Sequence, residues 1–264
     1  MQEGYRTDLT TKQWQLIQPL LPRPKKVPGG PGRPPSDLRI MINGVLYVVK
    51  TGCQWRMLPK EFGPWKTVYG YFNRWSQQGI WKRLMDTLRR WERRRQGRHE
   101  EPSAGCVDSQ SVKTATQGGP QGYDGGKKVK GRKRHLLVDT LGLILCVVVT
   151  AADAGDRSGL MGLLRRYFAR GVQRLRKLWV DGNYSGASLT AWVKSLKKTH
   201  TIDLEVVERQ GSGFQVVKRR WVVERTFAWL FNFRRHSKDY EVLVRNSEAM
   251  IQIAMIHLLI RRLA

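Results

Sequence analysis

Apolar side chains in the first hundred residues recur every three to four positions, which is the spacing of amphipathic helices. Thr10 or Thr11 can cap the first helix, and Ser36 or Asp37 can cap the second. The pattern predicts helices over residues 8–22, about 37–50, 66–78 and 80–95. The last three have basic outer faces and short Gly/Pro breaks, and they predict a helix-turn-helix-like DNA-binding unit. Six of the ten tryptophans lie here, and we interpret most of them as core aromatics rather than base-stacking platforms.

Residues 22–35 (PRPKKVPGGPGRPP) interrupt this helical pattern. Their proline and glycine content excludes regular secondary structure. Two interpretations stay open: a tether between helices, or a basic arm laid along a DNA backbone.

From residue 104 the pattern changes to short runs typical of strands, which alternate with helices. Strands are predicted at 104–108, 134–140, 143–150, 175–181 and 201–208, and helices at 156–170, 188–198, 218–235 and 247–263. Leu141-Gly142 predicts a hairpin, and residues 113–130 form a glycine-rich basic loop without the strand-then-helix context of a nucleotide site. This order predicts an α/β fold: an RNase H-like mixed five-stranded sheet flanked by helices and preceded by an all-α helix-turn-helix-like domain.

The join between the two parts is expected at Gly97–Pro102, so residues 1–100 form the helical DNA-binding domain and 101–264 the RNase H-like catalytic domain. The chain carries 48 Lys and Arg against 21 Asp and Glu, a formal net charge of +27. Such a charge indicates a polyanionic partner, and nucleic acid is favoured over a membrane surface because the basic residues are spread along the chain.

Two further patterns bear on where the chain acts. The longest apolar run, Met250–Ile260, is too short to span a bilayer. The three cysteines, Cys53, Cys106 and Cys146, lack metal-ligand spacing and are expected to be buried reduced thiols in an intracellular protein.

Three acids stand out by their context. Asp108 comes where the apolar pattern of the first strand stops, Asp181 ends the fourth strand, and Glu224 borders the apolar stripe of a late helix. In an RNase H-like sheet the first and fourth strands are parallel neighbours, so both aspartates should emerge at one edge. Each acid alone has a simpler interpretation: a turn role for the two aspartates, and an i, i+4 pair with Arg220 for Glu224. Together they favour a site for two divalent ions that promote phosphoryl transfer.

The remaining acids are weaker candidates for the divalent-ion site. Asp139 is expected in a turn, and Asp153 and Asp156 are expected to cap a helix. Asp203, Glu205 and Glu208 alternate along a strand, and we expect them on its solvent face.

The segments VDSQSVK, WVDGNYSG and RRWVVERTFAWL, which hold Asp108, Asp181 and Glu224, resemble a bacterial insertion-sequence DDE transposase of the insertion-sequence-five family. The resemblance covers nearly the whole chain, including the N-terminal GCQWRMLP…FGPWKTVYGYFNRW stretch. It implies that the three acids are catalytic and hold two Mg²⁺ ions, with Mn²⁺ as a substitute, for strand nicking and end joining.

The chain departs from the family near Glu224. Members of the family often carry the pattern Tyr-x2-Arg-x3-Glu-x6-Lys. In this chain Arg220 and Glu224 fit the pattern, but Val217 and Phe231 stand at the Tyr and Lys positions. Arg234 or Arg235 is the candidate for the lost DNA contact.

The expected DNA contacts are basic or amide side chains of the predicted reader helix, the basic loop and the late helix. They are Lys66, Asn73, Arg74, Lys127, Lys128, Lys130, Arg132, Arg220, Arg234 and Arg235. The expected partners are double-stranded DNA, as terminal inverted repeats and target, and further copies of the chain in a homodimer or higher oligomer, with no membrane. The setting would be the cytoplasm and nucleoid of a bacterium. Two alternatives stay open: a DNA-binding regulator without catalysis, and an RNase H-like nuclease or junction resolvase without strand transfer.

Overall fold

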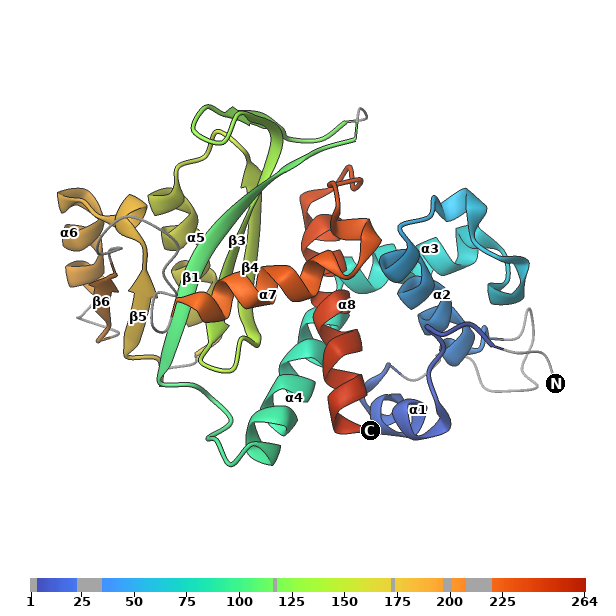
Figure 1. Cartoon of the computed structure of the whole chain (residues 1–264). Coiled ribbons are helices and arrows are strands. Elements are labelled where there is room, and N and C mark those ends of the chain that lie inside the picture. The colour runs from blue at the N-terminus through green and yellow to red at the C-terminus, as the bar shows by residue number, and fades with distance from the viewer. Residues whose placement is uncertain (1–3, 23–34, 116–117, 172–173, 197–200, 208–219) are drawn as a thin grey trace.

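The computed structural model describes residues 4–22, 35–115, 118–171, 174–196, 201–207 and 220–264. A curled mixed sheet with α5 and α6 lies at one end of the molecule and α1–α3 lie at the other, with α4, α7 and α8 between them (Figure 1). The described helices are α1 (Thr11–Ile17), α2 (Leu38–Thr51), α3 (Trp65–Gln77), α4 (Ile80–Arg95), α5 (Asp156–Phe168), α6 (Ala187–Leu196), α7 (Trp221–Phe231) and α8 (Val244–Leu263). The described strands are β1 (Ala104–Lys113), β2 (Gly122–Asp124), β3 (Val129–Asp139), β4 (Ile144–Ala151), β5 (Lys177–Val180) and β6 (Asp203–Val206).

The strand order is β2-β3-β1-β5-β6, with β4 also paired to β3. β1 runs antiparallel to β3 and parallel to β5, and β5 runs parallel to β6. Without the short β2, this is the order and direction of an RNase H-like sheet, which confirms the predicted fold class. The hairpin of β3 and β4 turns at Gly142, whose positive φ of 79° suits glycine.

The sheet has six strands rather than the five predicted. β3 begins at Val129, five residues earlier than expected, and its first residues pair with β2 inside the segment predicted to be a loop. The start of β3 is charged, with Arg132, Lys133 and Arg134 all buried. A pattern based on apolar residues therefore misses it.

Asp108 lies within β1 and not at its end, which corrects the prediction. Parallel pairing with β5 stops at Cys106, but antiparallel pairing with β3 continues to Lys113 opposite Gly131. The polar residues after Asp108 are therefore held by one neighbouring strand alone. This leaves the β5 side of β1 unpaired from Asp108 until Lys113, whose carbonyl oxygen accepts a hydrogen bond from the Asp239 amide.

The N-terminal helices lie close to their predicted ranges, except that the first is shorter than the predicted 8–22, since α1 ends at Ile17 and a 3-10 turn, Gln18–Leu20, follows it. Thr10 caps α1 in a capping box with Gln13, and Asp37 caps α2 by accepting a hydrogen bond from the Arg39 amide at 2.7 Å. α2 ends at Gly52, which has the left-handed φ of 74° typical of a helix C-terminus. Trp75 and Trp81 are buried in the core that these helices form, as predicted.

The C-terminal helix α8 belongs to the same hydrophobic core as the N-terminal helices. It packs against α1, α2, α3 and α4, and it also packs against β4. The boundary near residue 100 remains a prediction, and the two predicted domains share this core. Even this apolar helix is not a membrane span, since the described residues include no helix of the required length and hydropathy.

Cys53, Cys106 and Cys146 form no disulfide within the described residues. Cys106 and Cys146 are buried, as expected, and burial raises the pKa of each thiol to about 12. Cys53 is only half-buried. The two buried thiols are therefore protonated and unreactive at neutral pH.

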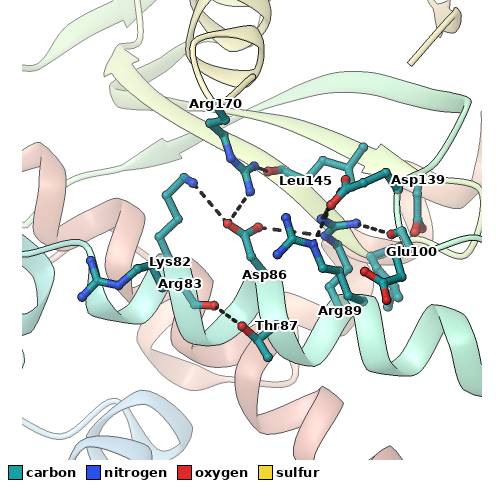
Figure 2. A network of polar contacts seen from close by, with 12 residues as sticks. Lys82, Arg83, Asp86, Thr87, Arg89, Glu100, Asp139, Leu145 and Arg170 are labelled. Carbon is teal, nitrogen blue, oxygen red and sulfur yellow. Dashed lines mark hydrogen bonds and ion pairs between the residues drawn. The ribbon is translucent and has the colours of Figure 1, made fainter. Parts of the chain in front are cut away.

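Ion pairs connect α4 to the sheet and to the end of α5. Arg93 of α4 lies 2.5 Å from the carboxylate of Asp139 at the end of β3, and both side chains are buried. Asp86 accepts hydrogen bonds from Lys82 and from Arg170, which follows α5 (Figure 2). Asp139 also accepts hydrogen bonds from the amides of residues 141 and 143, which confirms its predicted turn role.

Two glycines of α5 make a matched test of this packing. A Cβ on Gly159 would lie 2.2 Å from the buried ring of His135, whereas a Cβ on Gly162 would meet Val148 at an ordinary 3.8 Å. We expect Gly159→Ala to lower the free energy of unfolding by about 1–3 kcal/mol through overpacking. Gly162→Ala should raise it by about 0.5–1 kcal/mol through helix propensity. Urea unfolding followed by circular dichroism measures both, and a stabilised Gly159→Ala would contradict the packing.

Candidate active site

Two aspartates from parallel strands lie together at one edge of the sheet. Cys106 of β1 is opposite Trp179 of β5, and each strand reaches its aspartate two residues later. The Nη2 atom of Arg220 lies 3.4 Å from an oxygen of Asp181 and 4.0 Å from an oxygen of Asp108. The structure thus brings both carboxylates to one cationic group, at the edge that the strand order predicts.

The carboxylate of Asp108 is largely covered by protein. Burial raises its pKa to about 6, and the negative charge of Asp181 acts in the same direction. The hydrogen bond from the Ser109 amide, 2.7 Å long, and the charge of Arg220 oppose this rise. Because burial disfavours the charged form of Asp108, a nearby positive charge stabilises its carboxylate.

Asp181 has both of the roles considered for it. It caps the short 3-10 turn Gly182–Tyr184 by accepting a hydrogen bond from the Asn183 amide at 2.9 Å. Its other oxygen faces Arg220. The turn role therefore does not compete with the site, because the turn holds the carboxylate in place at the sheet edge.

Glu224 is exposed in the first turn of α7, one helical turn after Arg220. α7 packs against β1 and β3, which brings this helix to the edge that carries Asp108. Within the part of the chain that the structure describes, no three His, Cys, Asp or Glu side chains cluster closely enough to hold one metal ion. The structure therefore joins the two aspartates and leaves the third acid on the adjacent helix. Val217 lies outside the described residues, and Phe231 is exposed at the end of α7.

A polar cluster on the opposite face of β1 was missed by sequence reasoning. The Ser109 hydroxyl donates to Asp156 at 2.6 Å, and Lys133 lies 3.4 Å from both Asp156 and Asp124. Asp156 was predicted to cap α5, and this prediction is wrong, because Gly155 is the N-cap residue. The alternation of side chains along β1 could have indicated this cluster, because it places Ser109 on the face away from Asp108.

Six of the predicted DNA contacts are exposed: Lys66, Arg74, Lys127, Lys128, Lys130 and Arg234. Lys127 also donates to the carbonyl oxygen of Ser109 at 3.2 Å, next to Asp108. Asn73 is half-buried, and its side-chain oxygen accepts hydrogen bonds from Asn246 and Arg245 of α8. The exposed side chains stay candidates for DNA contact, whereas Asn73 is occupied within the protein.

Arg132 and Arg235 have structural roles, which corrects their prediction as DNA contacts. Arg132 is fully buried, and its guanidinium binds Asp239 and the carbonyl oxygens of residues 120, 241 and 242. Arg235 is buried, binds Glu241 at 2.6 Å and donates to the carbonyl oxygen of Cys53. Neither guanidinium is free to reach a phosphate. Arg220 is also buried, but it faces the two aspartates.

The donor set of this edge fits a hard divalent cation. Carboxylate oxygens are the protein ligands that Mg²⁺ and Mn²⁺ prefer, and a few of them suffice because Mg²⁺ keeps several waters. Asp108 and Asp181 already converge on one positive group. Two of the three predicted ligands are therefore placed to share a cation.

Comparison with known proteins identifies the family of the chain. Residues 9–85 match a family model described provisionally as "transposase of IS4/5 family", and residues 99–259 match the model "Transposase DDE domain". The second match covers more than half of the chain, which therefore belongs to the DDE transposases, enzymes whose substrate is DNA. Both matches together place it among the transposases of insertion sequences.

Curated relatives agree with this family. The chain is 37% identical over 108 residues to the insertion element IS402 uncharacterized 16.2 kDa protein of Burkholderia cepacia, covering 40% of this chain and 72% of the relative. It is 31% identical over 111 residues to a protein of the same organism, provisionally named as a transposase for insertion sequence element IS402. That second match covers 40% of this chain, and the chain spans about half of the relative, 51%.

Proposed function

We propose that this transposase binds the terminal inverted repeats of its insertion sequence, cuts a DNA strand there and joins the freed end to a target. The single observation that carries the proposal is the convergence of Asp108 and Asp181 on Arg220. A protein that only binds DNA gains nothing from two adjacent carboxylates, because they repel phosphates.

Each side chain of the site has a separate task in this proposal. Asp108 and Asp181 would hold two Mg²⁺ ions, and Glu224 would complete the ligand set from α7. When bound, the ions supply activation of a water or a 3′-hydroxyl and stabilisation of the leaving oxygen. Arg220 balances the charge of the paired carboxylates, with its Nη2 atom 3.4 Å from Asp181.

The DNA follows the exposed basic residues of the β2–β3 hairpin and α3. Lys128 and Lys130 extend from the hairpin, and Lys66 and Arg74 extend from α3. Cutting and joining two ends requires both to be held at once, so the active form is a homodimer or higher oligomer on DNA.

A cleavage assay tests the proposal. The full chain is incubated with duplexes that contain one end of the element, in Mg²⁺, in Mn²⁺ or in EDTA. We expect nicking at the end of the repeat with either ion and none in EDTA, followed by joining to a second duplex. Cutting without preference for the repeat would indicate a nuclease, and end binding without cutting in either ion would indicate a regulator.

The contribution of the hairpin lysines to DNA affinity is a further prediction. For binding dominated by phosphate contacts, log K falls linearly with log salt, by about 0.9 for each phosphate contacted. Lys130→Gln should therefore weaken binding and reduce that slope by about 0.9. Lys12→Gln makes the same charge change at an exposed position of α1, at the opposite end of the molecule from the sheet (Figure 1), and should leave the slope unchanged. Equal slopes for the two variants would exclude the hairpin from the DNA path.

A further inference from the structure

A cavity of about 590 Å³ lies between the segment after α2 and the segment that leads into α8. Four aromatic side chains line it: Trp55, Trp65, Tyr69 and Tyr240. Unlike Trp75 and Trp81, which are buried in the core, Trp65 is only half-buried and Tyr240 is exposed. The cavity therefore offers flat ring faces to a ligand, which the core tryptophans do not.

Cationic groups stack on these rings. The guanidinium of Arg56 and the amine of Lys66 lie 5.8 Å and 5.9 Å from the ring centre of Trp65. Arg235 lies 4.9 Å from the ring centre of Tyr240, but Glu241 neutralises it. The positive charge available to a ligand is therefore concentrated at Trp65, where Arg56 and Lys66 are both exposed.

Two buried polar atoms of the lining residues have no hydrogen-bond partner among the described residues. They are the indole Nε1 of Trp55, a donor, and the side-chain oxygen of Asn246, an acceptor. Asn246 is only 2% exposed, and its nitrogen donates to Asn73 at 3.2 Å, which fixes the orientation of the amide. Buried polar groups in native proteins almost always have partners. Both atoms are enclosed by protein, so a ligand whose edge carries an acceptor and a donor would satisfy them only after the lining side chains shift to admit it.

The rim of the cavity is apolar and exposed. Val242 and Leu243, which line the cavity, are 51% and 37% exposed. Exposed apolar side chains beside cations, on a DNA-binding protein with a net charge of +27, fit a ligand that combines a flat apolar body with an anionic backbone. An unpaired nucleobase has this combination, together with a hydrogen-bonding edge.

The cavity also lies within reach of DNA held at the acids. Asp239, next to Tyr240, pairs with Thr114 directly after β1, and Asp108 lies six residues earlier along the same chain segment. At about 3.3 Å per strand residue, that separation is roughly 20 Å. A strand cut at the acids can therefore also extend to the cavity.

We infer that this cavity binds an unpaired base of the DNA strand, stacked on Trp65 and Tyr240 and hydrogen-bonded by Trp55 and Asn246. A base that is still paired and stacked in a duplex has no free face to offer these rings. The inference depends on DNA as the substrate of the family, and it does not depend on the cleavage reaction proposed above.

The test compares two single-stranded probes that have the same phosphates: a short oligothymidine and the same oligomer with abasic sugars at every position. Binding of the full chain is measured by fluorescence anisotropy in EDTA, so that cleavage plays no part. We expect the wild-type protein to prefer the probe with bases by about tenfold or more. Trp65→Leu and Tyr240→Leu should each lose most of that preference, with affinity for the abasic probe nearly unchanged.

Trp192→Leu is the matched control, because Trp192 of α6 also carries a stacked arginine, Arg165, but lies far from the cavity (Figure 1). It should keep the full preference. Trp55→Phe keeps a ring without the indole donor and should weaken binding of the base probe about fivefold, which separates hydrogen bonding from packing. Circular dichroism checks that each variant folds.

Three results would overturn the inference. Equal losses for both probes would show that the cavity binds the backbone. A base preference unaffected by either Leu variant would remove the cavity from DNA binding, and a change of oligomeric state in Tyr240→Leu with preference retained would make the rim an interface between copies. Each of these results leaves the cleavage assay, and with it the proposed function, independently testable.

Discussion

Asp108→Asn and Asp181→Asn are each expected to lower the rate of strand cleavage by at least about a thousandfold, equivalent to about 4 kcal/mol of transition-state stabilisation. Asparagine keeps the shape of the side chain but removes the charge that holds a divalent ion. The two carboxylates converge on one guanidinium, so neither can take over the position of the other. Single-turnover cleavage of an end-containing duplex in Mg²⁺ measures the loss.

DNA affinity, measured alongside cleavage, distinguishes loss of chemistry from loss of binding. Both variants should bind DNA as tightly as the wild type or more tightly, because a negative charge near phosphates has been removed. Asp203→Asn makes the same change at an exposed position of β6 and should cleave normally. Substantial nicking by Asp108→Asn would exclude Asp108 from the metal site. Glu224→Gln tests the third ligand separately, and unchanged cleavage there would leave a site of two aspartates.

Asp139→Asn is expected to lower the free energy of unfolding by about 3–5 kcal/mol, because it leaves the Arg93 guanidinium buried without a counter-charge. The isosteric change can keep the oxygen that accepts from the amides of residues 141 and 143. The loss therefore reports mainly on the ion pair between α4 and the sheet. Urea unfolding of the full chain measures it.

Two further variants make this stability prediction specific. Glu100→Gln breaks the exposed pair with Arg94 and should cost no more than about 1 kcal/mol. The double variant Arg93→Met with Asp139→Leu removes both buried charges and should recover most of the stability lost in Asp139→Asn. If Asp139→Asn lowered the free energy of unfolding by no more than Glu100→Gln does, water or a rearranged side chain would have to satisfy the Arg93 guanidinium.

Local chemistry and strand order together made much of the fold predictable. α4 spans the residues predicted for it, and the caps at Thr10 and Asp37 follow from short polar side chains before apolar runs. The rule that parallel strands present their ends at one edge placed Asp108 and Asp181 together. These inferences depend on residues near in sequence or on a single topological step.

The parts that could not be predicted depend on contacts between distant segments. Nothing near Arg132 in the sequence shows that Asp239 and the carbonyl oxygens after it satisfy its guanidinium. Without that contact, a basic residue in a glycine-rich segment is expected to face DNA. The extension of β1 past Asp108 was hidden for the same reason, since the described strand that pairs with it there is the charged half of β3.

The position of α8 has a consequence for synthesis of the chain. α1 to α4 leave the ribosome well before α8, against which they pack, because α8 is made only after the whole sheet. The N-terminal helices therefore have an incomplete core until α8 has been translated, and their stable folding is expected to wait for that helix. Fragments released before α8 is made should be degraded by proteases rather than persist as free DNA-binding competitors of the complete enzyme.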